Sequence, residues 1–185
     1  MGAAGDTEGQ GAGASAGVER LNALPGDEAF ARLLECCGST RWARSMALRR
    51  PFADERQLVE AAERIWWGLA GDDWLEAFRS HPRIGEARPA RSTGAGAQRW
   101  AEEEQSSART AASATLDALA SANQSYEQRF GHIFIVCATG KSPEEMLETL
   151  RRRLSNDAAT ELCVAAEQQR RITLLRLRKL LAVSY

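Results

Sequence analysis

Two side chains of this sequence have the chemistry to exchange protons with a small molecule. The first is His81, one of only two histidines, which stands before Pro82 at the predicted C-terminal end of a short helix. Free carbonyl groups and the negative end of the helix dipole favour the protonated imidazole there, so we expect His81 to titrate near neutral pH. It could then serve as a general acid or base, or it could simply cap the helix.

The second is Glu104, the last of three consecutive glutamates. Such a run usually forms a solvated surface. At about 100° per residue, however, a long helix from about Gln98 towards Tyr126 would separate the three, and only Glu104 would continue the apolar stripe. A carboxylate on that stripe needs a partner or a task, because its desolvation is costly. The alternative is that Glu104 lies at the exposed end of the stripe.

Basic residues of the last predicted helix form the third candidate group. A guanidinium that reaches a cleft can hold a carboxylate through two hydrogen bonds. The spacing alone does not select one residue. The candidates are Arg170, Arg171, Arg176, Arg178 and Lys179.

The composition excludes several other classes of protein. A chain of 185 residues, 44% of them hydrophobic, suits one domain with a single sizeable core. Its 24 basic and 25 acidic residues give no general electrostatic reason to bind nucleic acid or an anionic membrane. The longest apolar stretch, 133–138, is too short to cross a bilayer. The four cysteines and two histidines lack zinc-ligand spacing, so we expect no metal site.

The elements that position these side chains are predicted to be helices from Val18 onward. Residues 1–17 are rich in Gly, Ala and Ser without the features of a secretory signal, so we expect a flexible tail, a domain over 18–185, and a cytoplasmic protein. Helix starts are predicted at Asp27, Ser39 or Thr40, Asp54, Asp72-Asp73, Ser142, and Ser155 or Asn156, with Gly38, Gly71 and Pro82 as end signals.

Segment 130–138 is the one β-like stretch. Since a lone strand would have no partner, we expect a buried extended or helical segment there. The predicted fold is therefore all-α.

Several short motifs follow one another along the chain in a specific order. They are Arg50-Pro51-Phe52, Asp73-Trp74-Leu75-Glu76-Ala77-Phe78, His81-Pro82-Arg83-Ile84-Gly85, Glu104-Gln105-Ser106, Asn123, Tyr126, Phe130-Gly131, Phe134-Ile135-Val136-Cys137-Ala138, Arg153-Leu154-Ser155-Asn156 and Leu175-Arg176-Leu177. In this order the sequence resembles the 2-oxo-4-hydroxy-4-carboxy-5-ureidoimidazoline (OHCU) decarboxylase family, from about Val18 to Leu181.

This resemblance implies a single-domain, all-α bundle of several helices. The implied activity is that of a carboxy-lyase of urate degradation, which converts OHCU to (S)-allantoin with loss of carbon dioxide. The family is often homodimeric and needs no cofactor or metal, because a ring C=N bond beside the departing carboxylate accepts the electron pair. The protein orients the small-molecule substrate and handles protons and charge.

The resemblance also assigns roles to residues. His81 is the implied catalytic acid or base, with Glu104 beside it, while Gln105 would bind the ring or ureido amides and Arg176 the substrate carboxylate. Pro82 would shape the pocket. Backbone groups would line the substrate ring at Ile135, Val136, Cys137, Ala138 and Thr139.

Two departures from the family pattern leave other functions open. Ala101 stands where a serine is common, and His132 where an aromatic residue is common. The alternatives are a decarboxylase of a related ureido or imidazoline acid, and a non-catalytic helical binding module with the same fold.

Overall fold

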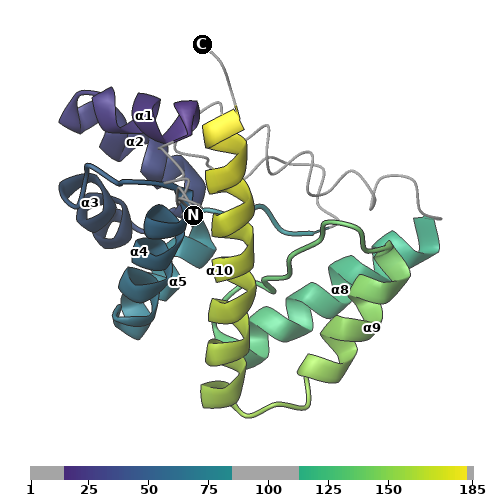
Figure 1. Cartoon of the computed structure of the whole chain (residues 1–185). Coiled ribbons are helices and arrows are strands. Elements are labelled where there is room, and N and C mark those ends of the chain that lie inside the picture. Colours follow the sequence, from purple (N-terminus) through teal and green to yellow (C-terminus); the bar gives the residue numbers. More distant parts are fainter. Residues whose placement is uncertain (1–14, 85–112, 183–185) are drawn as a thin grey trace, which may run out of the picture.

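The computed structural model describes residues 15–84 and 113–182, and within these ranges every regular element is a helix (Figure 1). The prediction of an all-α fold is thus confirmed. The helices are α1 (Ala16–Ala23), α2 (Gly26–Cys37), α3 (Thr40–Leu48), α4 (Glu55–Trp67), α5 (Gly71–Arg79), α8 (Ser113–Phe130), α9 (Pro143–Arg153) and α10 (Ala158–Ala182). None of these helices is both long and apolar enough to span a membrane.

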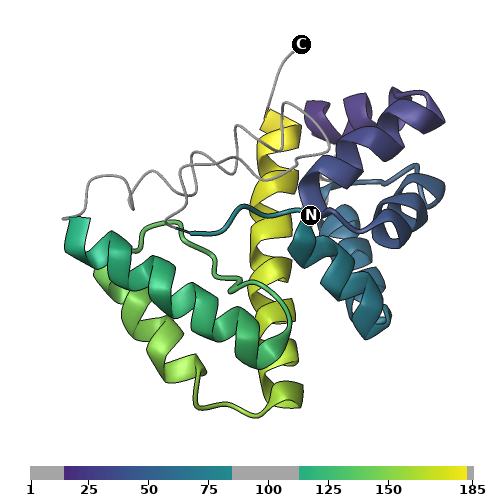
Figure 2. The same ribbon diagram turned by 180° about the vertical axis from the view of Figure 1, so that it is seen from behind.

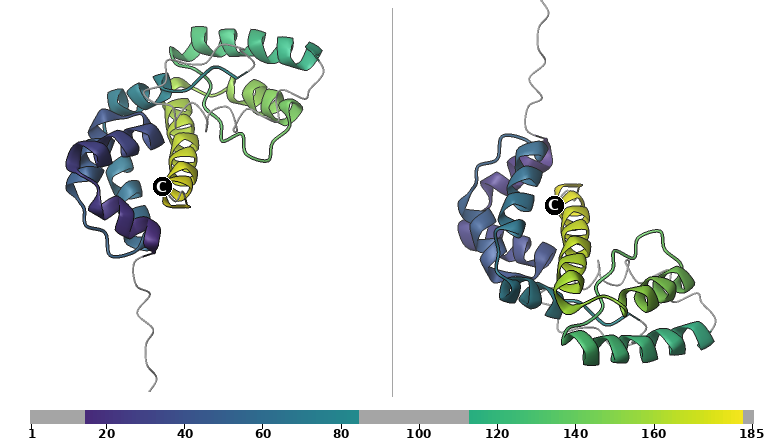
Figure 3. Two further views of the ribbon diagram at one scale, coloured as in Figure 1. Left: turned by 90° about the horizontal axis from the view of Figure 1, so that it is seen from above. Right: turned by 90° about the horizontal axis from the view of Figure 1, so that it is seen from below.

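Helix α10 is the central element of the described fold. The group α1–α5 packs along one side of it, and the pair α8 and α9 lies on the other side (Figures 1 and 2). The views from above and below show the same separation (Figure 3). Each side has its own buried apolar cluster, one around Trp42 and Trp66 and the other around Tyr126 and Met146. The composition led us to expect a single core, but the described chain has two.

Helix starts follow local capping chemistry at several predicted places. The Ser39 side chain accepts a hydrogen bond from the Trp42 amide, and the Asp54 carboxylate accepts one from the Gln57 amide. At α9, Ser142 forms the predicted reciprocal capping box with Glu145.

Other predicted boundaries are shifted. Helix α2 begins at Gly26, so Asp27 lies in its first turn and does not cap it. Gly68, not Gly71, ends α4, because its amide already binds the carbonyls of the last turn. Helix α10 starts at Ala158, later than predicted, with Asp157 accepting from the Thr160 amide at 2.9 Å.

The N-terminal boundary is shifted as well. Helix α1 begins at Ala16, inside the predicted 1–17 tail. Gly17 packs directly on α10, since a Cβ on it would lie 2.3 Å from the Leu181 carbonyl oxygen.

Candidate active site

His81 lies where the C-terminal ends of α2 and α5 meet α10. Helix α5 ends at Arg79, and the His81 amide donates to the Phe78 carbonyl at 3.1 Å. The chain then leaves helical geometry before Pro82, as predicted. The last turn of α5 therefore fixes the position of the His81 backbone.

Gly38 makes the close approach of α2 to this turn possible. It caps the C-terminus of α2 with φ of 81°, a left-handed conformation that favours glycine. A Cβ at this position would lie 2.1 Å from Ser80 Oγ. The Ser80 side chain, next to His81, thus occupies the space that a side chain on Gly38 would need.

Helix α10 contributes a buried polar stripe to the same junction. Gln169, Thr173 and Arg176 recur at intervals of four and three residues, so they share one face of the helix. The Gln169 Nε2 group donates to the Cys37 carbonyl and to Thr173 Oγ1, each at 3.2 Å. The bond to Cys37 connects α10 to the end of α2.

Burial distinguishes Arg176 from the other basic candidates of the last helix. Only 2% of Arg176 is exposed, and its positive charge acts on His81 and on the Cys36 and Cys37 thiols. By contrast, Arg170 and Arg171 form ion pairs with Glu167 on the surface. The structure therefore favours Arg176 as the arginine of the site, while its role in substrate binding stays a prediction.

The charge state of His81 differs from the expectation. Burial lowers the pKa of the imidazole from 6.5 to about 3, the Arg176 guanidinium lowers it as well, and Gln169 opposes both. The prediction that the helix end favours protonation is wrong, because desolvation and a nearby cation outweigh the helix dipole. His81 is a neutral base at physiological pH.

The segment between α8 and α9 has no regular secondary structure and is largely buried, so the prediction of a buried segment there is confirmed. Arg153 donates to the Ile135 carbonyl at 2.7 Å, and the Cys137 amide donates to Gln168 Oε1 at 3.1 Å. Val136 and Ala138 are buried, whereas Thr139 is exposed. These contacts hold the backbone of 135–139 in place, and its contact with a substrate ring stays a prediction.

Three predicted site residues, Ala101, Glu104 and Gln105, lie outside the described residues. The pairing of His81 with Glu104 therefore stays a prediction.

The described residues contain no cluster of three or more potential metal ligands. Burial also raises the pKa of the Cys37 thiol to about 12, so this sulfur stays protonated.

Sequence reasoning missed a second buried polar cluster, which we call the Arg153 cluster: Tyr126, Arg153, Asn156 and Glu161. The Arg153 guanidinium donates to Glu161, as do the Tyr126 hydroxyl and the Asn156 amide. Its signal was an arginine on the apolar face of α9 with Met146 and Leu150. The motifs of the resemblance include Tyr126, Arg153 and Asn156 but assign them no role. In the structure these residues bond to the buried Glu161 and so connect α8, α9 and α10.

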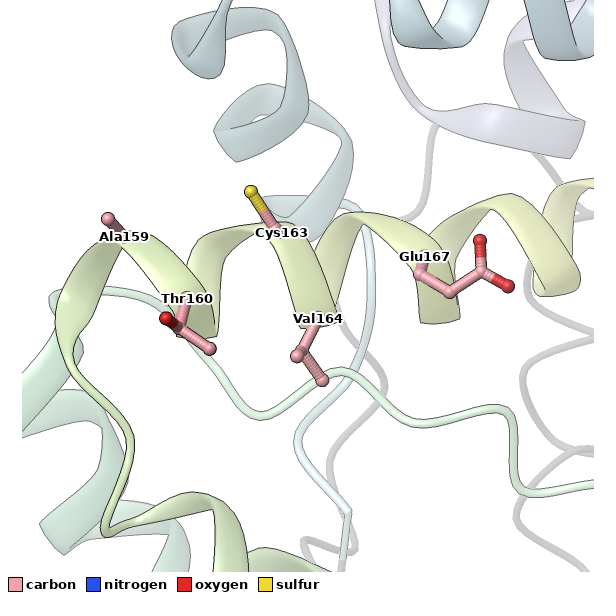
Figure 4. A pocket seen from close by; sticks show the side chains of 5 residues that line it. All are labelled: Ala159, Thr160, Cys163, Val164 and Glu167. Carbon is pink, nitrogen blue, oxygen red and sulfur yellow. The ribbon is translucent and has the colours of Figure 1, made fainter.

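A shallow hollow of about 550 Å³ lies along the first half of α10, away from this junction (Figure 4). None of the predicted site residues lines it, so we do not assign the substrate to it. Its lining residues are Ala159, Thr160, Cys163, Val164 and Glu167.

The fold and the site together define a helical protein in which a neutral histidine and a buried arginine meet at the junction of three helices. The family model described as OHCU decarboxylase matches residues 22–178. The chain belongs to the OHCU decarboxylase family.

Individual relatives agree with this assignment. The chain is 40% identical to the uric acid degradation bifunctional protein TTL of Arabidopsis thaliana over 78% of its own length, but it spans only 45% of that protein. It is 26% identical to the OHCU decarboxylase of Haloferax volcanii, covering 86% of this chain and 93% of the relative. A crystal structure of OHCU decarboxylase in the presence of (S)-allantoin superposes with a TM-score of 0.72 at 35% identity, over 83% of this chain and 99% of the other.

Proposed function

We propose that this protein removes the carboxylate of OHCU as carbon dioxide and forms (S)-allantoin in urate degradation. The observation that supports this most directly is the neutral His81 beside the buried Arg176, in a chain of this family. The first group accepts and returns protons, and the second offers a positive charge where the substrate carboxylate would bind.

The proposed reaction needs only electron movement within the substrate, the addition of two protons and the loss of one. The bond to the carboxylate breaks, its electron pair forms a C=C bond with the neighbouring ring carbon, and the C=N pair moves to nitrogen, which takes a proton. A proton then adds to the neighbouring ring carbon as the hydroxyl proton leaves, giving the carbonyl group and the stereocentre. A base held on one side of the ring would deliver that proton to one face only.

Substrate binding would also change His81 itself. The Arg176 charge is one cause of the lowered pKa of His81. A carboxylate bound to Arg176 would offset this charge and raise the pKa of the imidazole. His81 would thus gain proton affinity only when the substrate is present, which suits a group that must take up and release a proton in one cycle.

The test is to follow circular dichroism while urate is oxidised by uricase in the presence of hydroxyisourate hydrolase. The spontaneous reaction gives racemic allantoin, so we expect the protein to speed the loss of OHCU and to produce an optically active product. His81→Ala should abolish this signal, with His132→Phe as the matched histidine control. Racemic product at the spontaneous rate with the wild-type protein would contradict the proposal.

We further propose a cytoplasmic homodimer. The resemblance supports the dimer, and the four cysteines, all free thiols, suit a reducing compartment. Sedimentation of the purified protein tests the dimer, and fractionation of the source cells tests the compartment. A monomer at micromolar concentration, or recovery outside the cytoplasm, would contradict the respective part.

A further inference from the structure

We propose that Gln169 is a positioning residue for His81: its side-chain oxygen accepts a hydrogen bond from Nε2–H and thereby leaves Nδ1 as the basic nitrogen. Nothing in the motifs of the resemblance includes this glutamine. The inference rests on the proposed function only where turnover is the readout.

The first observation is a matched pair of unsatisfied atoms. Among the buried side-chain nitrogen and oxygen atoms of the described residues, His81 Nε2 and Gln169 Oε1 are without a hydrogen-bond partner. One is a potential donor and the other an acceptor. Buried polar atoms in proteins are nearly always paired, so two complementary exceptions in one junction point to each other.

The second observation is the orientation of the Gln169 amide. The Cys37 carbonyl can only accept, so the Gln169 group facing it at 3.2 Å must be the NH2. Thr173 Oγ1 holds the same nitrogen at 3.2 Å. With the nitrogen fixed by two partners, the oxygen is fixed at the opposite edge of the planar amide group.

The third observation is electrostatic. Gln169 acts on the pKa of His81 through its side chain and raises it, against burial and the Arg176 charge. The atoms have not reached the geometry of a formed hydrogen bond in this structure. A hydrogen bond between them would satisfy both atoms at once.

The chemical consequence concerns the tautomer. A neutral imidazole carries its proton on one nitrogen, and the hydrogen bond of that nitrogen selects which one. With Nε2–H donating to Gln169, the lone pair lies on Nδ1. The other histidine offers an internal contrast, because His132 Nδ1 lies 3.0 Å from the Ile133 carbonyl, which can only accept a hydrogen bond. The two histidines are therefore expected to be opposite tautomers.

Nitrogen-15 NMR of the histidine rings tests this in the wild-type protein without any assay of activity. With two histidines there are two ring systems, and His132→Phe assigns them. We expect the protonated ring nitrogen of His81 to be Nε2 at pH 7, and that of His132 to be Nδ1. A neutral His81 with its proton on Nδ1, or a charged His81, would overturn the proposal even if the enzyme is active.

Kinetics of two Gln169 variants supply the second readout. Gln169→Leu should lower kcat about 10-fold or more with little change in KM, because the base is then no longer held in one tautomer. Gln169→Glu keeps an acceptor oxygen and adds negative charge, which raises the pKa of His81. It should therefore move the acidic limb of the pH profile of kcat to higher pH. Gln128→Leu, an exposed glutamine of α8, is the matched control.

The outcomes separate this inference from the proposed function. Wild-type protein without turnover contradicts the function, while the ring NMR still decides on Gln169. An unchanged kcat and pH profile in a folded Gln169→Leu protein would refute the positioning role. Because that variant leaves the buried Cys37 carbonyl without its donor, circular dichroism must first show that it folds, and the wild-type NMR decides if it does not.

Discussion

Two buried arginines in this protein have very different surroundings. Arg153 is 5% exposed and faces a carboxylate, a phenol and a backbone carbonyl, all of which bond to it. Arg176 is 2% exposed, and the described groups whose pKa it shifts are an imidazole and two thiols, all neutral at pH 7. The charge of Arg153 is balanced by a buried carboxylate, whereas Arg176 acts electrostatically on groups that are neutral at pH 7.

This contrast distinguishes the Arg153 cluster, whose polar groups satisfy one another, from the Arg176 junction, which contains two unpaired polar atoms. In the Arg153 cluster, Glu161 is fully buried and accepts from three side chains. At the Arg176 junction, two buried polar atoms of His81 and Gln169 lack partners. Unsatisfied buried groups cost stability, and proteins retain them mainly where function requires it.

The largest effect is expected from breaking the Arg153 cluster. Arg153→Met would leave the Glu161 carboxylate buried without its cation and should lower the free energy of unfolding by about 3–5 kcal/mol. Urea denaturation measures this, with the exposed neighbour Arg151→Met as the control. A loss comparable to that of the control would show that Arg153 is not a structural centre.

The next effect is on turnover at the other arginine. Arg176→Met should reduce kcat/KM roughly 100-fold, since a charged contact to a substrate carboxylate is removed, equivalent to about 2.7 kcal/mol. It should also raise the pKa of His81, because the opposing charge is gone. Steady-state kinetics across pH measures both kcat/KM and the pKa of His81. The exposed Arg178→Met is the matched control. Unchanged kcat/KM would remove Arg176 from the site.

The effect expected on acid stability is smaller when it is measured over a single pH unit. The pKa of His81 is about 3 in the folded protein and near 6.5 when unfolded, so between these values only the unfolded chain binds the proton. Stability from this group is complete above pH 6.5 and is lost as the pH falls towards 3, at no more than about 1.4 kcal/mol per pH unit. His81→Phe should therefore unfold less steeply with acid than the wild type, with His132→Phe measured alongside. Equal slopes for His81→Phe and wild type would contradict the lowered pKa of the partly buried imidazole.

The smallest effect is expected from a surface pair next to the site. Arg83 bonds Glu127 of α8 with 46% and 27% of the side chains exposed, so the pair should contribute less than about 1 kcal/mol. A double-mutant cycle of Arg83→Met and Glu127→Gln at low and high salt measures the coupling. A salt-insensitive coupling of several kcal/mol would mean that this pair behaves like the buried Arg153 cluster.

Local chemistry explains which parts of the fold could be predicted. The caps at Ser39, Asp54 and Ser142 depend on residues three positions away; Asp54 and Ser142 were identified correctly, and Ser39 was one of two predicted alternatives. The end of α5 before His81 follows from Pro82 alone. The order of motifs further identified the family.

Contacts between distant segments explain what could not be predicted. Gln169 lies in a polar run that looks like a solvated face, and its partner Cys37 is 132 positions away. The charge of His81 was predicted from its own helix, but α10 supplies the burial and the cation that reverse it. The same holds for Arg176, which sequence spacing could not distinguish from its neighbours.

Gly38 has a consequence for how this protein can change over time. Any side chain there would collide with Ser80, and a residue with a Cβ would have to adopt the unfavourable φ of 81°. The imidazole is thus aligned by a missing methyl group on a different helix, 43 positions upstream of His81 in sequence. Substitutions of Gly38 are therefore expected to displace Ser80 and with it His81, and so to lower activity. Position 38 would also allow the imidazole to be moved without changing any residue proposed to contact the substrate.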